Sequence, residues 1–436
     1  MRQSIWHLRS RVDARSSSVR RCRALLCGLA LASSALSLTG CSNINGFLEP
    51  NPDAFNAPGT THVEIVVATT RAPAATRAVM FGGGRAPVPQ FADMLVSIPP
   101  AANRKIGDVQ WPKQLPGNAL TDFVTLRADV INRDQAIATF SRLLRESNKS
   151  EAMVFVHGFN QRYDDAVYRF AQILHDSGAL GTVAPVLFTW PSKGSVFSYG
   201  YDRESANYSR DALEALLRFL AKDPKVKKIS ILAHSMGNWV TLEALRQMAI
   251  RDGRVAPKIQ LVLLAAPDVD VQVAEEQIST MGPDRPHVVL FTSQDDKALA
   301  ASKEVWGAPR LGAIDPDVEP YRAMLAKEKI SVINLTTFPS HDEFNHGKFA
   351  EDPKVIELIG RGLASGQVLT DSRVGFGEKI MQTTASAASS VGHAAGLVVS
   401  APVAIVDPDT RDHFDAQVDQ FTQSVTHIGP TSEPSQ

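Results

Sequence analysis

The chain is poor in cysteine, and the few cysteines it has are all close to its N-terminus. They are Cys22, Cys27 and Cys41 in a chain of 436 residues. The part after Cys41 therefore has no disulfide, no thiolate nucleophile and no thiolate metal site. It must be held together by core packing, and an apolar content of 44% in a chain this long is sufficient for a large core.

The chain also lacks a strong excess of one charge. Its formal net charge is −1, and seven arginines and one acid precede Cys41. The other 38 basic and 45 acidic residues give the rest of the chain a net charge of −7. A nucleic-acid-binding surface is usually basic, so we expect no nucleic-acid partner.

A long, strongly hydrophobic run is absent as well. The uncharged segment 381–406 is long enough to span a membrane, but it is weakly hydrophobic and Pro402 interrupts it. Residues 2–23 are strongly basic, and the apolar segment Ala24–Leu38 is too short to span a bilayer comfortably. This order is typical of a signal peptide. The segment ends in Leu38-Thr-Gly-Cys41, which resembles a bacterial lipoprotein box.

That resemblance implies cleavage before Cys41 and acylation of its thiol, including palmitate. Several acyl chains on one residue are enough for lasting attachment to a membrane. We therefore expect a lipid-anchored protein of the cell envelope that faces the periplasm, at the outer membrane. An ordinary signal peptide and an uncleaved anchor remain alternatives.

Composition divides the chain into four parts. Residues 1–40 are the predicted signal peptide, and the Asn-, Pro- and Gly-rich residues 41–60 are a predicted tether. Residues 61–363 form the predicted folded domain. Residues 364–436 are an Ala-, Ser- and Gly-rich appendage that we expect to be partly disordered and to contact the domain or a membrane.

Short apolar runs alternate with helical patterns along the predicted domain. The expected strands are 62–69, 91–98, 123–130, 152–156, 184–190, 229–233, 259–265, 287–292 and 330–335. Helices are expected over 134–147, 164–177, 203–222, 271–280, 321–327 and 353–363, and after the run 229–233. This alternation predicts an α/β fold with a mostly parallel central sheet and helices on both faces. Functional residues are then expected at the carboxyl ends of the strands.

A serine lies at one such strand end. The run Ile229–Ala233 leads into His234-Ser235-Met236-Gly237, and a helical pattern follows. Strand, tight turn and helix are the context of a nucleophilic serine in a G-x-S-x-G-type sequence, although Ala233 replaces the first glycine. A serine that only caps the following helix is the alternative interpretation.

A second strand end supplies candidate oxyanion donors. Val156 is followed by His157-Gly158-Phe159, and a glycine allows the chain to turn sharply toward the serine. The backbone N–H groups of Phe159 and Met236 are the expected donors. A simple strand-to-loop turn would have the same sequence.

Two adjacent aspartates follow the strand 287–292, where a triad carboxylate is expected. Asp296 is the preferred candidate because a helix starts at Lys297, and Asp295 is then its solvated neighbour. The two could be exchanged. Asp268 and Asp270 follow an earlier strand and are interpreted as turn, capping or pocket-wall residues.

Two histidines follow the last predicted strand. His346 precedes a glycine and is the preferred base, and His341 is the second candidate. A metal site built from His341, Asp342, Glu343 and His346 is disfavoured, because histidines five residues apart do not share a helical face. No metal and no cofactor are expected.

Seven motifs together are similar to those of the bacterial α/β-hydrolase family of unknown function, whose members are commonly labelled as an esterase/lipase superfamily. The motifs are Thr69-Thr70-Arg71, Val96-Ser-Ile-Pro99, Phe155-Val-His-Gly-Phe159, Trp190-Pro-Ser192, Tyr201-Asp202-Arg-Glu-Ser205, Ala233-His-Ser-Met-Gly237 and Ala266-Pro-Asp268. The resemblance covers roughly residues 61–363. It implies the α/β-hydrolase fold and a serine hydrolase that uses Ser235, His346 and Asp296.

The expected activity is hydrolysis of carboxylic esters, small or lipid, through an acyl-enzyme intermediate. The aromatic-rich loop from Trp190 to Tyr208 is a candidate acyl pocket or lid. A non-catalytic envelope lipoprotein is one alternative. An acyltransferase or peptidase with the same three residues is another. The physiological substrate and the oligomeric state do not follow from the sequence.

Overall fold

A single mixed sheet organises the protein. The computed structural model describes residues 46–147 and 150–365. Within these ranges nine strands follow the spatial order β3-β2-β1-β5-β4-β6-β7-β8-β9. The pairs β1–β2 and β2–β3 are antiparallel, and the other neighbours are parallel. The strands are β1 (Thr61–Pro73), β2 (Phe81–Ile98), β3 (Val124–Ile131), β4 (Glu151–Val156), β5 (Ala184–Thr189), β6 (Lys228–His234), β7 (Ile259–Ala265), β8 (His287–Thr292) and β9 (Ser331–Asn334).

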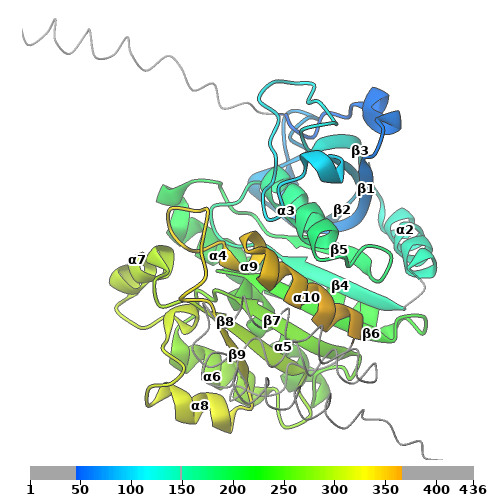
Figure 1. The fold of residues 1–436 in the computed structure, drawn as a ribbon. Coiled ribbons are helices and arrows are strands. Elements are labelled where there is room, and N and C mark those ends of the chain that lie inside the picture. Colours follow the sequence, from blue (N-terminus) through cyan, green and yellow to red (C-terminus); the bar gives the residue numbers. More distant parts are fainter. Residues whose placement is uncertain (1–45, 148–149, 366–436) are drawn as a thin grey trace, which may run out of the picture. The chain divides into compact units, whose positions relative to one another are not determined.

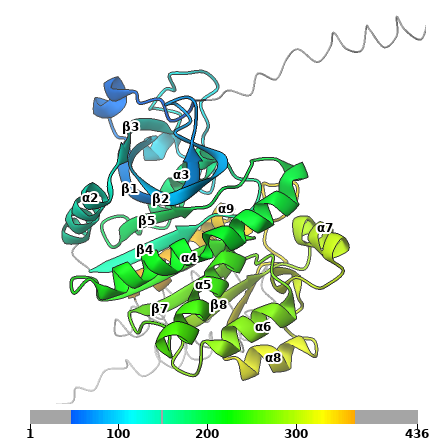
Figure 2. The same cartoon turned by 180° about the vertical axis from the view of Figure 1, so that it is seen from behind.

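Helices cover the sheet on both sides. Those described are α2 (Arg133–Glu146), α3 (Tyr163–Asp176), α4 (Tyr199–Lys222), α5 (Gly237–Asp252), α6 (Val271–Thr280), α7 (Lys297–Trp306), α8 (Tyr321–Lys327), α9 (Lys348–Glu351) and α10 (Pro353–Ser365). Helices α3, α9 and α10 lie over one face (Figure 1), and α4, α5 and α6 lie over the other (Figure 2).

The central strands are apolar on both faces because both faces are buried. Every residue of β4 is buried, and its Val154 joins a core cluster that includes side chains of α2, α4 and α5. The next residue, Phe155, points the other way and stacks on Phe170 of α3 at 5.3 Å. The predicted mostly parallel sheet with helices on both faces is therefore confirmed.

Two predicted boundaries were wrong. The expected strands 62–69 and 91–98 were too short, because β1 runs to Pro73 and β2 starts at Phe81, with Arg71 paired to Arg85 across register shifts. The three glycines and the prolines of this hairpin conceal the alternation that identifies a strand. Helix α4 starts at Tyr199, four residues before the predicted Arg203, where Gly200 weakens the helical signal.

The predicted tether, residues 41–60, is described from Gly46 onward, and this part contacts the domain. Leu48 is completely buried. The carbonyl of Phe47 accepts hydrogen bonds from Thr125 and Tyr168, and Asn51 N donates to the carbonyl of Thr125 at 2.8 Å. The predicted signal peptide, Cys41 and the appendage from residue 366 lie outside the described residues.

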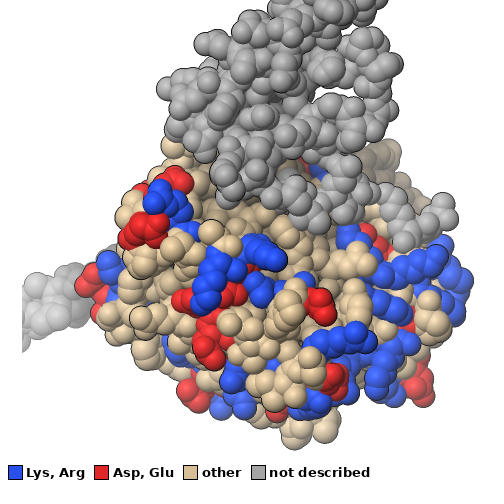
Figure 3. Space-filling view, turned by 90° about the horizontal axis from the view of Figure 1, so that it is seen from below, with Lys and Arg blue, Asp and Glu red and all other residues tan. Residues whose placement is uncertain are grey.

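Two surface properties bear on partners. Among the described residues, no helix is both long enough and apolar enough to cross a membrane. On the face drawn in Figure 3, acidic and basic side chains are interspersed. Mixed charge of this kind is typical of an ordinary solvated surface.

The contact between α10 and α3 yields a stability test. A Cβ on Gly360 would overlap the backbone oxygen of Ser177, whereas a Cβ on Gly362, in the same helix, would meet no described atom within 4 Å. Alanine favours helices, so Gly362→Ala should stabilise the protein by about 0.5–1 kcal/mol. Gly360→Ala should destabilise it by about 1–3 kcal/mol, because α10 must move away from α3.

Urea unfolding of both variants measures this difference. Equal stabilisation by the two substitutions would show that α10 does not pack on Ser177 as described.

Candidate active site

Ser235 lies directly after β6 in a strained turn. Its φ is 52°, a left-handed value that costs a non-glycine residue about 1–3 kcal/mol. Backbone hydrogen bonds hold it there: Ser235 N donates to the carbonyl of Ala265, and Asp268 N donates to the carbonyl of Ser235 at 3.2 Å. The Asn238 amide donates to both of these carbonyls, at 3.0 and 3.1 Å.

Two glycines leave room for this turn. A Cβ on Gly158 would lie 2.8 Å from the Cβ of Ser235 and 2.9 Å from Nδ1 of His234. A Cβ on Gly237 would overlap the backbone oxygen of His157. The end of β4 and the start of α5 therefore approach each other closely because neither position carries a side chain.

His346 and Asp296 are brought together over 50 residues of sequence. Nδ1 of His346 lies 2.6 Å from Oδ2 of Asp296, and the other carboxylate oxygen accepts from Leu299 N at 2.9 Å as the N-cap of α7. The Asp296 side chain is fully buried. A histidine bonded in this way at Nδ1 keeps Nε2 available to exchange a proton.

The electrostatics of His346 follow from this pairing. Burial acts to lower its pKa, but the charge of Asp296 and the hydrogen bond to it act in the opposite direction, with smaller effects of Asp268 and Asp342. The net result is a pKa above the usual 6.5. The imidazolium form is therefore stabilised in this environment.

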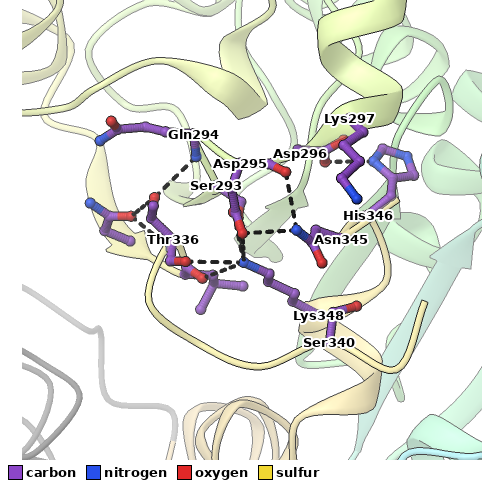
Figure 4. A network of polar contacts seen from close by, with 12 residues as sticks. Ser293, Gln294, Asp295, Asp296, Lys297, Thr336, Ser340, Asn345, His346 and Lys348 are labelled. Atoms are coloured by element: carbon purple, nitrogen blue, oxygen red, sulfur yellow. Dashed lines mark hydrogen bonds and ion pairs between the residues drawn. The ribbon is translucent and has the colours of Figure 1, made fainter. Parts of the chain in front are cut away.

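Asp295, the alternative acid, is engaged elsewhere (Figure 4). Its carboxylate lies 2.7 Å from Nζ of Lys348 and accepts from Ser293 Oγ at 2.6 Å. Burial acts to raise its pKa, but the hydrogen bonds from Lys348 and Ser293 hold the pKa below its usual value. The preferred candidate Asp296, and not Asp295, is the carboxylate that contacts His346.

Lys348 also positions the histidine loop, which is the segment 335–347 that carries His346. Its buried ammonium donates to the carbonyls of Leu335 and Thr336, at 3.0 and 3.2 Å, where β9 ends (Figure 4). From the other side, the Asp342 carboxylate accepts from His346 N at 2.6 Å and from Gly347 N at 2.8 Å. The loop is thus held by charged hydrogen bonds on both sides of His346.

His341, the alternative base, lies away from Asp296. Its side chain is 62% exposed, and its Nδ1 lies 3.3 Å from the carboxylate of Asp108. In the part of the chain that the structure describes, no group of three or more His, Cys, Asp and Glu side chains could hold a metal ion.

The loop after β4 rests on a buried arginine. Arg71 donates to the carbonyls of Ser192 at 2.9 Å and Gln161 at 2.7 Å, and its Nη2 lies 3.3 Å from Nε2 of His157. Burial lowers the pKa of Arg71 to about 10, so it keeps its charge at pH 7. Burial of the His157 ring and the nearby charge of Arg71 hold the pKa of His157 well below its usual value, so this imidazole is neutral.

The neutral His157 ring has a definite hydrogen-bonding pattern. Its Nδ1 lies 2.8 Å from the carbonyl of Gly158 and donates to it, while its Nε2 accepts from Trp190 N at 3.1 Å. The indole of Trp190 stacks on the ring at 4.9 Å and donates to the carbonyl of His157. His157 therefore supports the loop from behind and does not titrate near pH 7.

The other predicted site residues occupy the same edge of the sheet. Met236 is buried and is the N-cap of α5. Phe159 packs against Tyr199 at 5.0 Å. The His234 ring contacts His346 at 4.8 Å, and burial, with the charge of His346, holds the pKa of His234 well below its usual value.

Two buried aspartates tie these loops together. The sequence placed Asp202 only within a family motif and interpreted Asp268 as a turn, capping or pocket-wall residue, so their contacts were missed. Asp202, completely buried, accepts from Ser192 Oγ at 2.5 Å and from Lys193 N at 2.9 Å. Asp268 accepts from Tyr199 Oη at 2.5 Å and from Ser302 Oγ at 2.6 Å, which joins α4 and α7 to the serine turn. Ser192 is 10 residues from Asp202 and Tyr199 is 69 residues from Asp268, so no local pattern identifies these contacts.

The comparison with known proteins identifies a family. Residues 132–362, more than half of the chain, match the family described as "Alpha/beta hydrolase of unknown function (DUF900)". An uncharacterized protein of Nostoc sp., alr1448, is 30% identical over 155 residues, which are 30% of this chain and 40% of that protein. The chain thus spans less than half the length of this relative.

Solved esterases show a distant likeness. An esterase of Pyrobaculum calidifontis is 12% identical with a TM-score of 0.30, over 54% of this chain and 92% of that chain. Carboxyl esterase 2 of the fungus Tuber melanosporum is 12% identical with a TM-score of 0.32, over 77% of this chain and 97% of that chain. Both structures are too dissimilar to indicate what this chain acts on.

The two adjacent aspartates provide a matched test of the histidine environment. Asp296→Asn should lower the pKa of His346, because burial then acts without the opposing carboxylate. Asp295→Asn, which removes the partner of Lys348, should leave the pKa of His346 above 6.5. NMR titration of labelled histidine measures both pKa values, with His346→Gln to assign the signal. A larger fall in Asp295→Asn would contradict the described pairing.

Proposed function

The chain belongs to the family of alpha/beta hydrolases of unknown function, and from this premise we propose that it is a serine hydrolase that cleaves carboxylic esters. The observation that supports this most directly is the 2.6 Å contact between His346 and a fully buried Asp296, at the edge of the sheet where Ser235 lies in a strained turn. Nucleophile, acid and base then follow in the chain order Ser, Asp, His.

The proposed first step acylates the enzyme. Nε2 of His346 removes the proton of Ser235 Oγ as the oxygen forms a bond to the ester carbonyl carbon. The backbone N–H groups of Phe159 and Met236 stabilise the resulting oxyanion. His346 then gives its proton to the leaving alkoxide, the carbon–oxygen bond breaks, and an acyl-Ser235 ester remains.

Water completes the proposed cycle. His346 takes a proton from water, the hydroxide attacks the acyl carbonyl, and Ser235 leaves with that proton as the free carboxylic acid is released. Asp296 remains ionised throughout and stabilises the imidazolium. The neutral His157 and His234 are not required to exchange protons in this scheme.

A fluorophosphonate probe tests the proposal. Ser235 should be labelled in the wild type and Ser235→Ala should not, with a fall in ester hydrolysis of roughly a million-fold in kcat. Ser279→Ala, at an exposed position of α6, is the matched serine control and should still be labelled. Para-nitrophenyl esters of increasing chain length then define the acyl preference.

Each alternative has its own outcome. A folded protein without Ser235-dependent labelling would be a non-catalytic binding protein. Labelling with release of the acyl group to an added alcohol rather than to water would indicate an acyltransferase, and cleavage of amides in preference to esters a peptidase.

We further propose that Cys41 carries the lipid anchor and holds the protein at the periplasmic side of the outer membrane. The basic, apolar and small-residue order before Cys41 supports this. Labelled palmitate should be incorporated by the wild type and not by Cys41→Ala, whereas Cys27→Ala should retain it. Membrane fractionation checks the location. Incorporation by Cys41→Ala would overturn the proposed anchor.

A further inference from the structure

Arg203 of α4 lies over two indole rings. Its guanidinium carbon is 4.6 Å from the ring centre of Trp239 on α5 and 4.5 Å from that of Trp306 at the end of α7. The Trp239 indole is itself oriented by a hydrogen bond from its Nε1 to Asn207 at 2.6 Å. Each contact is within the distance at which a cation is attracted to an aromatic face.

The charge of Arg203 is not balanced by a nearby carboxylate. Within the described part of the chain, Arg203 makes no ion pair within 4 Å and no hydrogen bond through its side chain. Its side chain is half-buried, and its nitrogens are not among the buried polar atoms without a partner. The nitrogens of the guanidinium are therefore unpaired but reached by solvent.

This group is close to the proposed nucleophile. Trp239 is the third residue of α5, which starts two residues after Ser235. Tyr199 lies one turn before Arg203 on α4, contacts Trp306 at 5.8 Å, and donates to Asp268. The aromatic surface thus runs from Phe159, beside the proposed oxyanion donors, to Arg203.

The free donors of the guanidinium determine which ligand fits. Its planar N–H groups have no partner within the described part of the chain and remain available to a ligand. Carboxylate and phosphate groups accept two such parallel hydrogen bonds. The aromatic rings also hold the group in one orientation, which reduces the entropy lost on binding.

We propose that Arg203 binds a carboxylate or phosphate group carried by the ester substrate, so that the preferred substrates are anionic esters. This rests on the proposed hydrolase function and adds the substrate class to it. Arg203 would be a specificity-determining residue: the anionic group is held at Arg203 while the ester carbonyl lies at Ser235.

A purely structural role is the competing explanation, since Arg203 connects α4, α5 and α7. Loss of a connection between helices would reduce stability and affect all esters equally. Loss of an anion-binding group would instead change the ratio between charged and neutral esters. The ratio of kcat/KM values is therefore the informative quantity.

Two pairs of probes cover the two sides of the ester. On the acyl side, the para-nitrophenyl monoester of glutaric acid is compared with para-nitrophenyl valerate, which has the same number of acyl carbons and no carboxylate. On the alcohol side, butyryl glycerophosphate is compared with monobutyrin, with acid release followed by titration. The variants are Arg203→Met, which retains an apolar side chain, and Arg203→Lys, which retains the charge.

In the wild type we expect the anionic ester of at least one pair to be favoured, and Arg203→Met to reduce this preference about 10-fold or more. Arg203→Lys should retain part of it. Arg133→Met, which removes another arginine stacked on an aromatic ring (Phe219, 5.6 Å), is the matched control and should leave the preference unchanged. Thermal unfolding of all variants shows that they are folded.

No preference in either pair, or an unchanged preference in Arg203→Met, would overturn the proposal. Neutral esters and fluorophosphonate labelling of Ser235 separate this result from failure of the hydrolase function. If Arg203→Met still cleaves para-nitrophenyl valerate and is still labelled, the hydrolase function is intact. The kcat/KM ratio between anionic and neutral esters then tests the substrate class alone. If the wild type cleaves no ester and is not labelled, the hydrolase proposal itself fails.

Discussion

Ser235 is held in a left-handed backbone conformation between β6 and α5, and the surrounding structure must compensate for that strain. The backbone of Ala265, Asp268 and Asn238, together with the Asn238 amide, supplies the compensating hydrogen bonds. The same turn requires the end of β4 to pass so closely that a side chain at position 158 would meet Ser235. The glycines at positions 158 and 237 follow from this close approach.

Buried charges hold the two loops that face this turn, in a domain without disulfides. Arg71 fixes the loop after β4 mainly through backbone carbonyls, and Lys348 fixes the histidine loop through carbonyls and Asp295. A buried cation is costly unless its donors are satisfied, so each one strongly favours the arrangement that supplies acceptors. Such cations specify loop geometry, because few other arrangements provide the same acceptors.

The proposed reacting groups and the proposed specificity residue belong to different elements. The proposed reacting groups follow β6, β8 and β9, which belong to the sheet itself. The aromatic surface with Arg203 is built by α4, α5 and α7, which are joined to the serine turn through Asp268, Tyr199 and Ser302. A fold can retain its reacting groups while changes in the surrounding helices alter which substrate it binds.

The sequence by itself determined the class of fold and the place of the site, because apolar periodicity and the glycines beside the serine are local signals. It favoured Asp296 over Asp295 and His346 over His341. Only the tertiary structure shows which aspartate contacts which histidine. Neighbouring residues in a turn point in different directions, and contacts such as Lys348 with Asp295, 53 residues apart, set which one faces the histidine. Arg71 and His157, 86 residues apart, show the same limit, because burial of a charge depends on distant partners that no local pattern contains.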